Sequence, residues 1–153
     1  MHREMKAVLA LSLFIQMAVM SSSSAQPPKV IGSWKVEIVF ANGETHSVRF
    51  DAQASGKGSL ALLIPKPISV GPAEGPAAKW SEGDNGSMIF SGPVQFPLGN
   101  VGLLRGTLVL RGQFQSEGSI TGEATFFPMD QEAKDPEAKP SKRGTFKATR
   151  VAD

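Results

Sequence analysis

Large apolar residues alternate with polar ones along much of the chain, and the alternation has a period of two. In residues 34–40 a tryptophan, a valine, an isoleucine and a phenylalanine occupy every second position. Because successive side chains of a β-strand point to opposite faces, this pattern predicts a strand with one buried face. Asn42-Gly43 follows, a strong hairpin signal since both turn positions take positive φ. The return strand over 44–51 presents a second apolar face, made of His46, Val48 and Phe50.

Six further segments have strand character, and short turns separate most of them. They are 59–64, 79–81, 87–91, 103–114, 119–127 and 144–151. Gly92-Pro93 is expected to interrupt the strand after residues 87–91, because proline has no N–H to donate to a ladder hydrogen bond. Residues 94–96 then continue at a sheet edge or after a bulge. Residues 65–76 hold four prolines and two glycines. They predict a long connection, with 65–78 as a lid over one end of the sheet.

The predicted fold class is all-β, because eight or nine strands joined by short turns form an antiparallel meander. Closing the meander into a single up-and-down barrel of about eight strands removes its unpaired edges. A β-sandwich is the alternative architecture, but its Greek-key crossings need long connections. Only 65–76 and 128–143 are long enough, so a barrel is favoured.

The first 25 residues predict a secretory signal peptide. Arg3 and Lys6 supply its positive start, an apolar run over 7–20 follows, and Ser23 and Ala25 suit cleavage before residue 26. A retained anchor is the alternative, but 14 helical residues span about 21 Å, short of the roughly 30 Å hydrocarbon core. We therefore expect one mature domain over 26–153, secreted or periplasmic, without stable membrane insertion.

Composition excludes several classes of function. The 153 residues include no cysteine, so disulfides, thiolate metal sites and cysteine nucleophiles are excluded. Sixteen basic residues nearly balance 14 acidic ones, and a net charge of +2 gives no strong field for nucleic acid. No cofactor and no metal are expected.

Both ends of the mature chain carry a recognisable pattern. Gly32-Ser33-Trp34 opens the first predicted strand, and Arg150 stands near the end of the last. These residues resemble the calycin pattern, the barrel superfamily of lipocalins, fatty-acid-binding proteins and avidins. The resemblance implies that Arg150 packs across Trp34 and closes one barrel end, with Gly32, Trp34 and Arg150 as structural closure residues. The ending also resembles that of small secreted bacterial β-barrel domains of unassigned function. The second lipocalin motif is absent, since the chain has no tyrosine, and no ligand is carried over.

Candidate chemistry is sparse. His46 is the one histidine of the mature chain, and its place beside Val48 and Phe50 predicts a packed or rim residue rather than a catalytic base. A nucleophile motif such as Gly-x-Ser-x-Gly is missing, and Asp84-Asn85-Gly86 is typical of a plain turn. We therefore predict that the protein is not an enzyme.

Two functions remain open at this point. The first is non-enzymatic binding of a small apolar ligand inside the barrel, lined by Val36, Ile38, Val48, Phe50, Leu108 and Phe126. The alternative is a solid barrel that acts through its outside as a protein-interaction or envelope-associated module. Trp80 follows the proline-rich segment and predicts either a residue at a ligand-binding mouth or a core residue. A cavity of about 300 Å³ or more would favour binding.

Overall fold

The computed structural model describes residues 29–64, 77–98, 101–116, 118–129, 137 and 139–152. The predicted signal peptide, residues 65–76 of the expected lid and most of the charged segment after residue 129 lie outside these ranges. Ala77 and Ala78, which the sequence placed in the lid, are instead the first residues of a strand. They pair with Ser59 and Gly58 of the preceding strand, which fixes them in the sheet.

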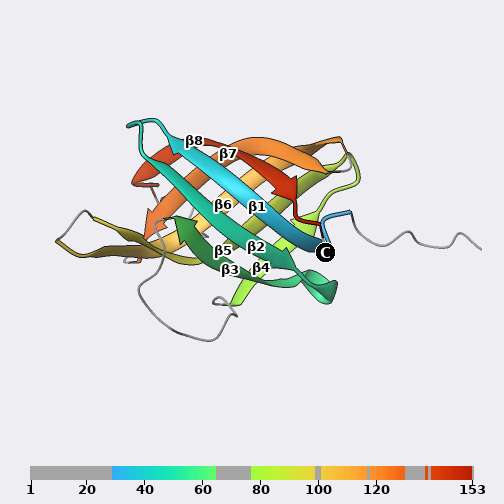
Figure 1. The fold of residues 1–153 in the computed structure, drawn as a ribbon, viewed down its shortest axis with the longest axis horizontal. Helices are drawn as coiled ribbons and strands as arrows, with labels where there is room; N and C mark the ends of the chain where they lie inside the picture. Colours follow the sequence, from blue (N-terminus) through green and yellow to red (C-terminus); the bar gives the residue numbers. More distant parts are fainter. Residues whose placement is uncertain are drawn as a thin grey trace, which may run out of the picture.

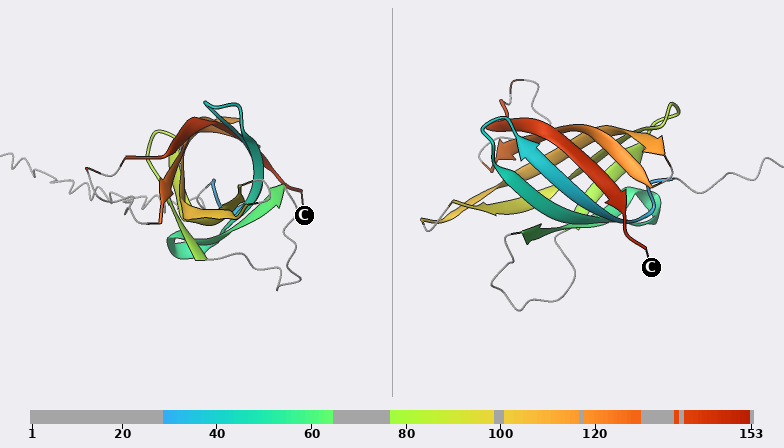
Figure 2. Two further views of the ribbon diagram at one scale, coloured as in Figure 1. Left: turned by 90° about the vertical axis from the view of Figure 1, so that its left-hand side faces the viewer. Right: turned by 45° about the horizontal axis from the view of Figure 1, so that its top comes forward.

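Eight antiparallel strands form a closed barrel in which every strand pairs with its neighbours in the sequence (Figure 1). The strands are β1 (Gly32–Phe40), β2 (Thr45–Ala52), β3 (Lys57–Ile64), β4 (Ala77–Glu82), β5 (Ser87–Pro97), β6 (Leu103–Ser116), β7 (Ser119–Pro128) and β8 (Lys142–Arg150). The predicted up-and-down barrel is confirmed, and the β-sandwich is excluded. Viewed along its axis, the barrel is a ring of strands (Figure 2, left).

Pairing between the first and last strands closes the ring. β1 and β8 are antiparallel from Trp34 opposite Arg150 to Phe40 opposite Gly144. Gly144 lets the two strands approach closely, because a Cβ at this position would lie 2.1 Å from the carbonyl oxygen of Val39. This pairing leaves β1 and β8 without a free edge.

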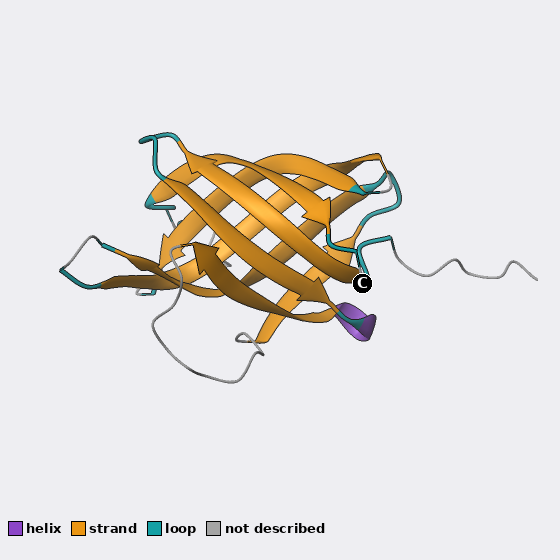
Figure 3. Ribbon diagram, in the orientation of Figure 1, coloured by secondary structure: helices purple, strands orange, loops and turns teal. Residues whose placement is uncertain are grey.

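The inward face of the barrel follows the period of two. In β1 the residues Trp34, Val36, Ile38 and Phe40 are buried, whereas Lys35, Glu37 and Val39 are exposed. One continuous apolar core fills the barrel from end to end. In the described parts of the chain, secondary structure other than strand is limited to the single 3₁₀ turn Ala54–Gly56, and no helix is long and apolar enough to cross a bilayer (Figure 3).

The predicted interruption at Gly92-Pro93 is wrong, because β5 runs unbroken from Ser87 to Pro97. The proline is tolerated for a positional reason. β4 pairs with β5 as far as Ser91, and beyond that residue β5 has no described partner on the β4 side. Pro93 therefore lies on a local strand edge, where a missing N–H costs no ladder hydrogen bond.

Among the described residues, the ladders of β4 are the shortest in the barrel. β4 shares three residue pairs with β3 and four with β5, whereas β5 and β6 share eleven. Among the described residues, the part of β3 after Ser59 and the part of β5 after Ser91 have no partner on their β4 sides. We call the stretch between Leu60–Ile64 and Gly92–Pro97 the wall break.

Candidate functional site

The barrel has two ends of different construction. The start of β1 and the last residue of β8 lie at one end, which we call the Arg150 end. The opposite end carries the β1–β2 turn over 41–44 and the start of β8, and we call it the His46 end. The long β5–β6 hairpin extends from the His46 end, at the left of Figure 1, whereas the C-terminus lies at the Arg150 end.

The short segment before β1 closes the Arg150 end. Val30 is fully buried, and its carbonyl oxygen accepts a 2.8 Å hydrogen bond from Trp34 Nε1. The Arg150 guanidinium carbon lies 4.4 Å from the centroid of the Trp34 ring. Arg150 also donates to the carbonyl oxygens of Ile31, at 2.8 Å, and Lys29. The structure thus brings Trp34 and Arg150 into the contact that the calycin resemblance implies.

Gly32 belongs to the same construction. Its φ of +131° is a conformation that side chains disfavour, and a Cβ here would lie 2.4 Å from Arg150 Nη1. A residue with a side chain would therefore push the guanidinium off its carbonyl partners. The three closure residues named from the sequence lie together at this end.

Trp80 lies near the Arg150 end, away from His46. Its indole Nε1 donates to the carbonyl oxygens of Gln53 and Lys57, at 2.7 and 2.8 Å. The ring is half-buried and packs against the core. Trp80 therefore fastens the turn between β2 and β3 onto β4.

Six of the predicted ligand-lining residues meet inside the barrel. Their side chains are 0–1% exposed, which leaves no water-sized space against any of them. The six residues are Val36, Ile38, Val48, Phe50, Leu108 and Phe126. Aromatic rings occupy much of the volume, since Phe50 stacks on Phe90 at 4.1 Å between centroids and on Trp34 at 6.0 Å. The barrel centre is therefore filled by its own side chains.

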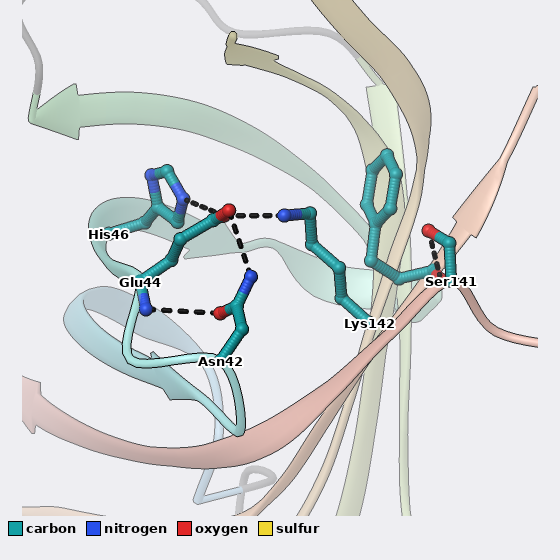
Figure 4. A network of polar contacts seen from close by, with 6 residues as sticks. Asn42, Glu44, His46, Ser141 and Lys142 are labelled. Carbon is teal, nitrogen blue, oxygen red and sulfur yellow. Dashed lines mark hydrogen bonds and ion pairs between the residues drawn. The ribbon is translucent and has the colours of Figure 1, made fainter. Parts of the chain in front are cut away.

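A polar cluster covers the His46 end and is built on the Asn42-Gly43 turn. Asn42 Oδ1 accepts a 3.0 Å hydrogen bond from the backbone N–H of Glu44, as in an Asx turn. Asn42 Nδ2 donates to Glu44 Oε1 at 2.9 Å, and His46 Nε2 lies 3.4 Å from Glu44 Oε2. Figure 4 shows the Glu44 carboxylate between the imidazole and the Lys142 ammonium.

Lys142 reaches this cluster from the first position of β8, 98 residues away in the sequence. Its ammonium lies 2.5 Å from Glu44 Oε2 and 5.8 Å from the centroid of the Phe40 ring. The side chain is 13% exposed. The neighbouring Ser141 is held by its backbone N–H, which donates to the Phe126 carbonyl at 2.9 Å.

The cluster keeps Glu44 ionised. The hydrogen bond from Lys142 is the main cause that lowers the pKa of the Glu44 carboxyl below its ordinary value of 4.5. The hydrogen bond with His46 acts in the same direction, and partial desolvation opposes both. At neutral pH the carboxylate therefore offers acceptors only.

The imidazole of His46 is enclosed by aromatic rings. Its centroid lies 4.2 Å from that of Phe96, and Phe40 meets it edge-on at 5.9 Å. The His46 side chain is 8% exposed. Nδ1 is buried and has no hydrogen-bond partner, the one such side-chain atom in the part of the chain described here. A buried polar atom without a partner is uncommon in proteins and costs free energy.

The His46–Phe96 contact lies inside the barrel, next to the wall break. β2 and β5 are not neighbours in the barrel, because β3 and β4 lie between them. At the level of His46 the described β2–β3 ladder has passed its last pair, Ser47 with Ile64, and the β4–β5 ladder has also ended. The two rings therefore meet across the barrel interior, as the rings of Phe50 and Phe90 on the same two strands do.

Metal binding finds no support in the part of the chain that the structure describes, where no three His, Asp or Glu side chains converge. Asp51 accepts hydrogen bonds from Ser33 and Arg49. Glu82 accepts one from the Lys29 N–H. Both carboxylates have protein partners and resemble ordinary surface groups.

Sequence reasoning placed His46 correctly on the inward face of β2 but did not find its cluster. Glu44 and His46 at alternate positions were a local signal that was available. Lys142 and Phe96 carried no comparable signal, because their positions depend on the closure of the barrel.

The sequence matches no known protein family and no curated protein. Among solved structures, the chain is similar to a redesigned β-barrel, b11L5F_LGL, with a TM-score of 0.44 and 10% identity over 81% of this chain and 93% of that chain. It is also similar to the structure of EF1p2_mFAP2b bound to DFHBI, with a TM-score of 0.43 and 9% identity over 81% of this chain and 94% of that chain.

Proposed function

We propose that the protein is a non-enzymatic binding protein, secreted or periplasmic, that takes a small apolar ligand at the His46 end of its barrel. The observation that carries this proposal is the wall break beside an aromatic-lined interior. Ligand sites favour an apolar lining with a few polar groups. The Phe40 and Phe96 rings with the Glu44–His46–Lys142 cluster have that composition.

The filled centre limits the ligand to this end. Val36, Ile38 and Phe50 are fully buried deep in the barrel, and a ligand there would have to displace well-packed side chains. At the wall break, Leu62 is only half-buried. A ligand that enters here displaces the Phe96 ring from His46 while the hydrogen-bonded ladders of β1, β2 and β8 stay intact.

The absence of enzyme chemistry remains part of the proposal. His46 has a carboxylate neighbour, as a general base requires, but no described hydroxyl lies against its other ring nitrogen. Export also remains a proposal, supported by Arg3, Lys6, the apolar run over 7–20 and Ala25. The intact mass of the exported protein tests it, since a mass that includes residues 1–25 would contradict cleavage.

Fluorescence titration with prodan, a neutral apolar dye without a hydrogen-bond donor, tests the binding site. We expect saturable binding of one dye per chain. Leu62→Trp adds a bulky ring at the wall break and should weaken binding at least about tenfold, equivalent to about 1.4 kcal/mol. Phe114→Trp is the matched control, because Phe114 is also a half-buried core residue but contacts Trp34 at the Arg150 end.

A second candidate function rests on the fully buried centre. In it the barrel is solid and acts through its outside as a protein-interaction or envelope-associated module. The titration separates the two candidates. No saturable dye binding by the wild-type protein, or equal weakening by both tryptophan variants, would reject the ligand site and favour the solid barrel.

A further inference from the structure

The two ring nitrogens of His46 have different hydrogen-bonding roles. Lys142 holds Glu44 as a carboxylate, which has no proton to give. His46 Nε2, 3.4 Å from Glu44 Oε2, must therefore carry the hydrogen of that contact. In the neutral imidazole the other nitrogen, Nδ1, is then an acceptor with a free lone pair.

This lone pair lies in apolar surroundings. The two rings against the imidazole, Phe40 and Phe96, offer no N–H or O–H group. The strand residue opposite His46 in β1 is Ile38, which is also apolar. The described charged groups at the ring are Glu44, from the β1–β2 turn, and Lys142, from β8, and both act on the Nε2 side (Figure 4).

We propose that the ligand at the His46 end carries a hydroxyl or N–H group that donates a hydrogen bond to His46 Nδ1, on an otherwise apolar body packed against Phe40 and Phe96. This inference rests on the function proposed above and names the ligand class for that site. It excludes pure hydrocarbons and carboxylates as preferred ligands. A hydrocarbon leaves Nδ1 without a partner, and a carboxylate presents a second acceptor to an acceptor.

A geometric consequence follows from the His46–Phe96 stack. A flat ring that slides between β3 and β5 takes over part of the surface that Phe96 offers to the imidazole. To donate to Nδ1, its hydroxyl must lie near the plane of the imidazole, in which the lone pair points. Phenol-like molecules have both features, a flat apolar body and one donor.

The test compares 2-naphthol with 2-methoxynaphthalene as competitors of prodan. The two molecules share one ring system, but only the naphthol is a donor. The added methyl group makes the ether the more hydrophobic molecule, so burial alone would favour the ether. We expect 2-naphthol to bind at least about tenfold more tightly to the wild-type protein. In His46→Phe this preference should fall to about one.

A second readout uses the wild-type protein alone and does not depend on a variant that folds. The ¹⁵N chemical shift of His46 Nδ1 should move on addition of 2-naphthol and stay unchanged with the ether, because a new hydrogen bond alters the lone pair. Equal affinities of the two compounds for the wild-type protein would overturn the inference while the binding function stands. A naphthol preference that persists in His46→Phe would overturn it as well. Failure of prodan and both compounds to bind would reject the binding function itself.

Discussion

The two ends of the barrel use the same kinds of group with opposite results. At the Arg150 end an aromatic N–H and a guanidinium find carbonyl partners, since Trp34 donates to Val30 and Arg150 donates to Ile31. At the His46 end an aromatic nitrogen, His46 Nδ1, is left without one. A barrel end whose polar groups have hydrogen-bond partners stabilises the fold, whereas a buried acceptor without a partner can still accept a hydrogen bond from a ligand.

The two ends also differ in the strand ladders that lie behind their side-chain contacts. The β1–β8 ladder includes Trp34 opposite Arg150, so the closed end has sheet directly behind its cation–π contact. At the His46 end the described ladders of β4 have ended, so the stack of His46 on Phe96 has no described β4 sheet behind it. Contacts between side chains alone can separate at lower cost than a hydrogen-bonded ladder. The comparison therefore assigns stability to the Arg150 end and adaptability to the His46 end.

Truncation of Trp34 or Arg150, which close the Arg150 end, should have the largest effect on the free energy of unfolding. Trp34→Ala should lower the free energy of unfolding by about 3–5 kcal/mol, because it removes a fully buried indole. Arg150→Ala should also destabilise, and the double variant should depart from additivity by about 0.5–3 kcal/mol. Urea unfolding of the four proteins measures this coupling. Additive losses would mean that the cation–π contact contributes nothing to closure.

One glycine at each end gives a matched pair of alanine variants. Gly32→Ala combines a φ of +131° with a clash against Arg150 Nη1, and should cost about 2–3 kcal/mol. Gly43→Ala, at the other end, has a φ of +88° but open space around its Cβ, and should cost about 1 kcal/mol. Thermal or urea unfolding compares them. Equal costs would show that the arginine does not need Gly32.

Removal of an aromatic nitrogen should have opposite signs at the two ends. His46→Phe keeps a ring against Phe96 and deletes the unpaired Nδ1. It also deletes the long 3.4 Å contact of Nε2 with Glu44, but the exposed Glu44 carboxylate keeps Lys142 as a partner, so the free energy of unfolding should still rise by about 1 kcal/mol. Trp34→Phe should lower it, because the Val30 carbonyl loses its donor. Urea midpoints of the two variants check the signs. A destabilised His46→Phe would mean that the Nε2–Glu44 hydrogen bond outweighs the cost of the unpaired Nδ1, or that Nδ1 is not a free acceptor.

The smallest expected effect is the pH dependence of folding stability that comes from Glu44. The pKa of Glu44 is lowered in the folded state. The stability that its carboxylate contributes is therefore fully present above the ordinary pKa of 4.5, and it is lost as the pH falls through the lowered pKa of the folded state. The Glu44 side chain is 43% exposed, which screens the ion pair. Glu44→Gln should therefore cost about 0.5 kcal/mol at pH 6.

That cost should shrink as the pH is lowered below 4.5, as followed by urea unfolding at several pH values. The matched control is Arg150→Ala. Arg150 donates its hydrogen bonds to carbonyl oxygens, which do not titrate, so the cost of its removal should stay constant over the same range. A cost of Glu44→Gln that does not change with pH would contradict the ion pair with Lys142.

The alternation of apolar and polar residues predicted most of the strands and their inward faces, and it favoured the barrel over the sandwich. The alternation over 34–40 marked the buried face of β1, and the resemblance implied the contact of Trp34 with Arg150. Asn42-Gly43 marked the hairpin, but the positive φ expected at both positions is found at Gly43 and not at Asn42. These features are local or lie in paired strands, where a period of two fixes which side chains face inward. At Pro93 the expected interruption is wrong, whereas the edge position expected for 94–96 agrees with the described β4–β5 ladder, which ends at Ser91.

Tertiary structure alone decided what meets inside the barrel. A period of two states that His46 and Phe96 both face inward, but not that they stack across two intervening strands at 4.2 Å. That contact depends on side-chain volumes, strand lengths and barrel closure together. The same holds for Lys142, which β8 delivers to Glu44 over 98 residues of chain. Whether the polar atoms of a barrel end are paired or left free is therefore set by packing between distant segments, which no local pattern encodes.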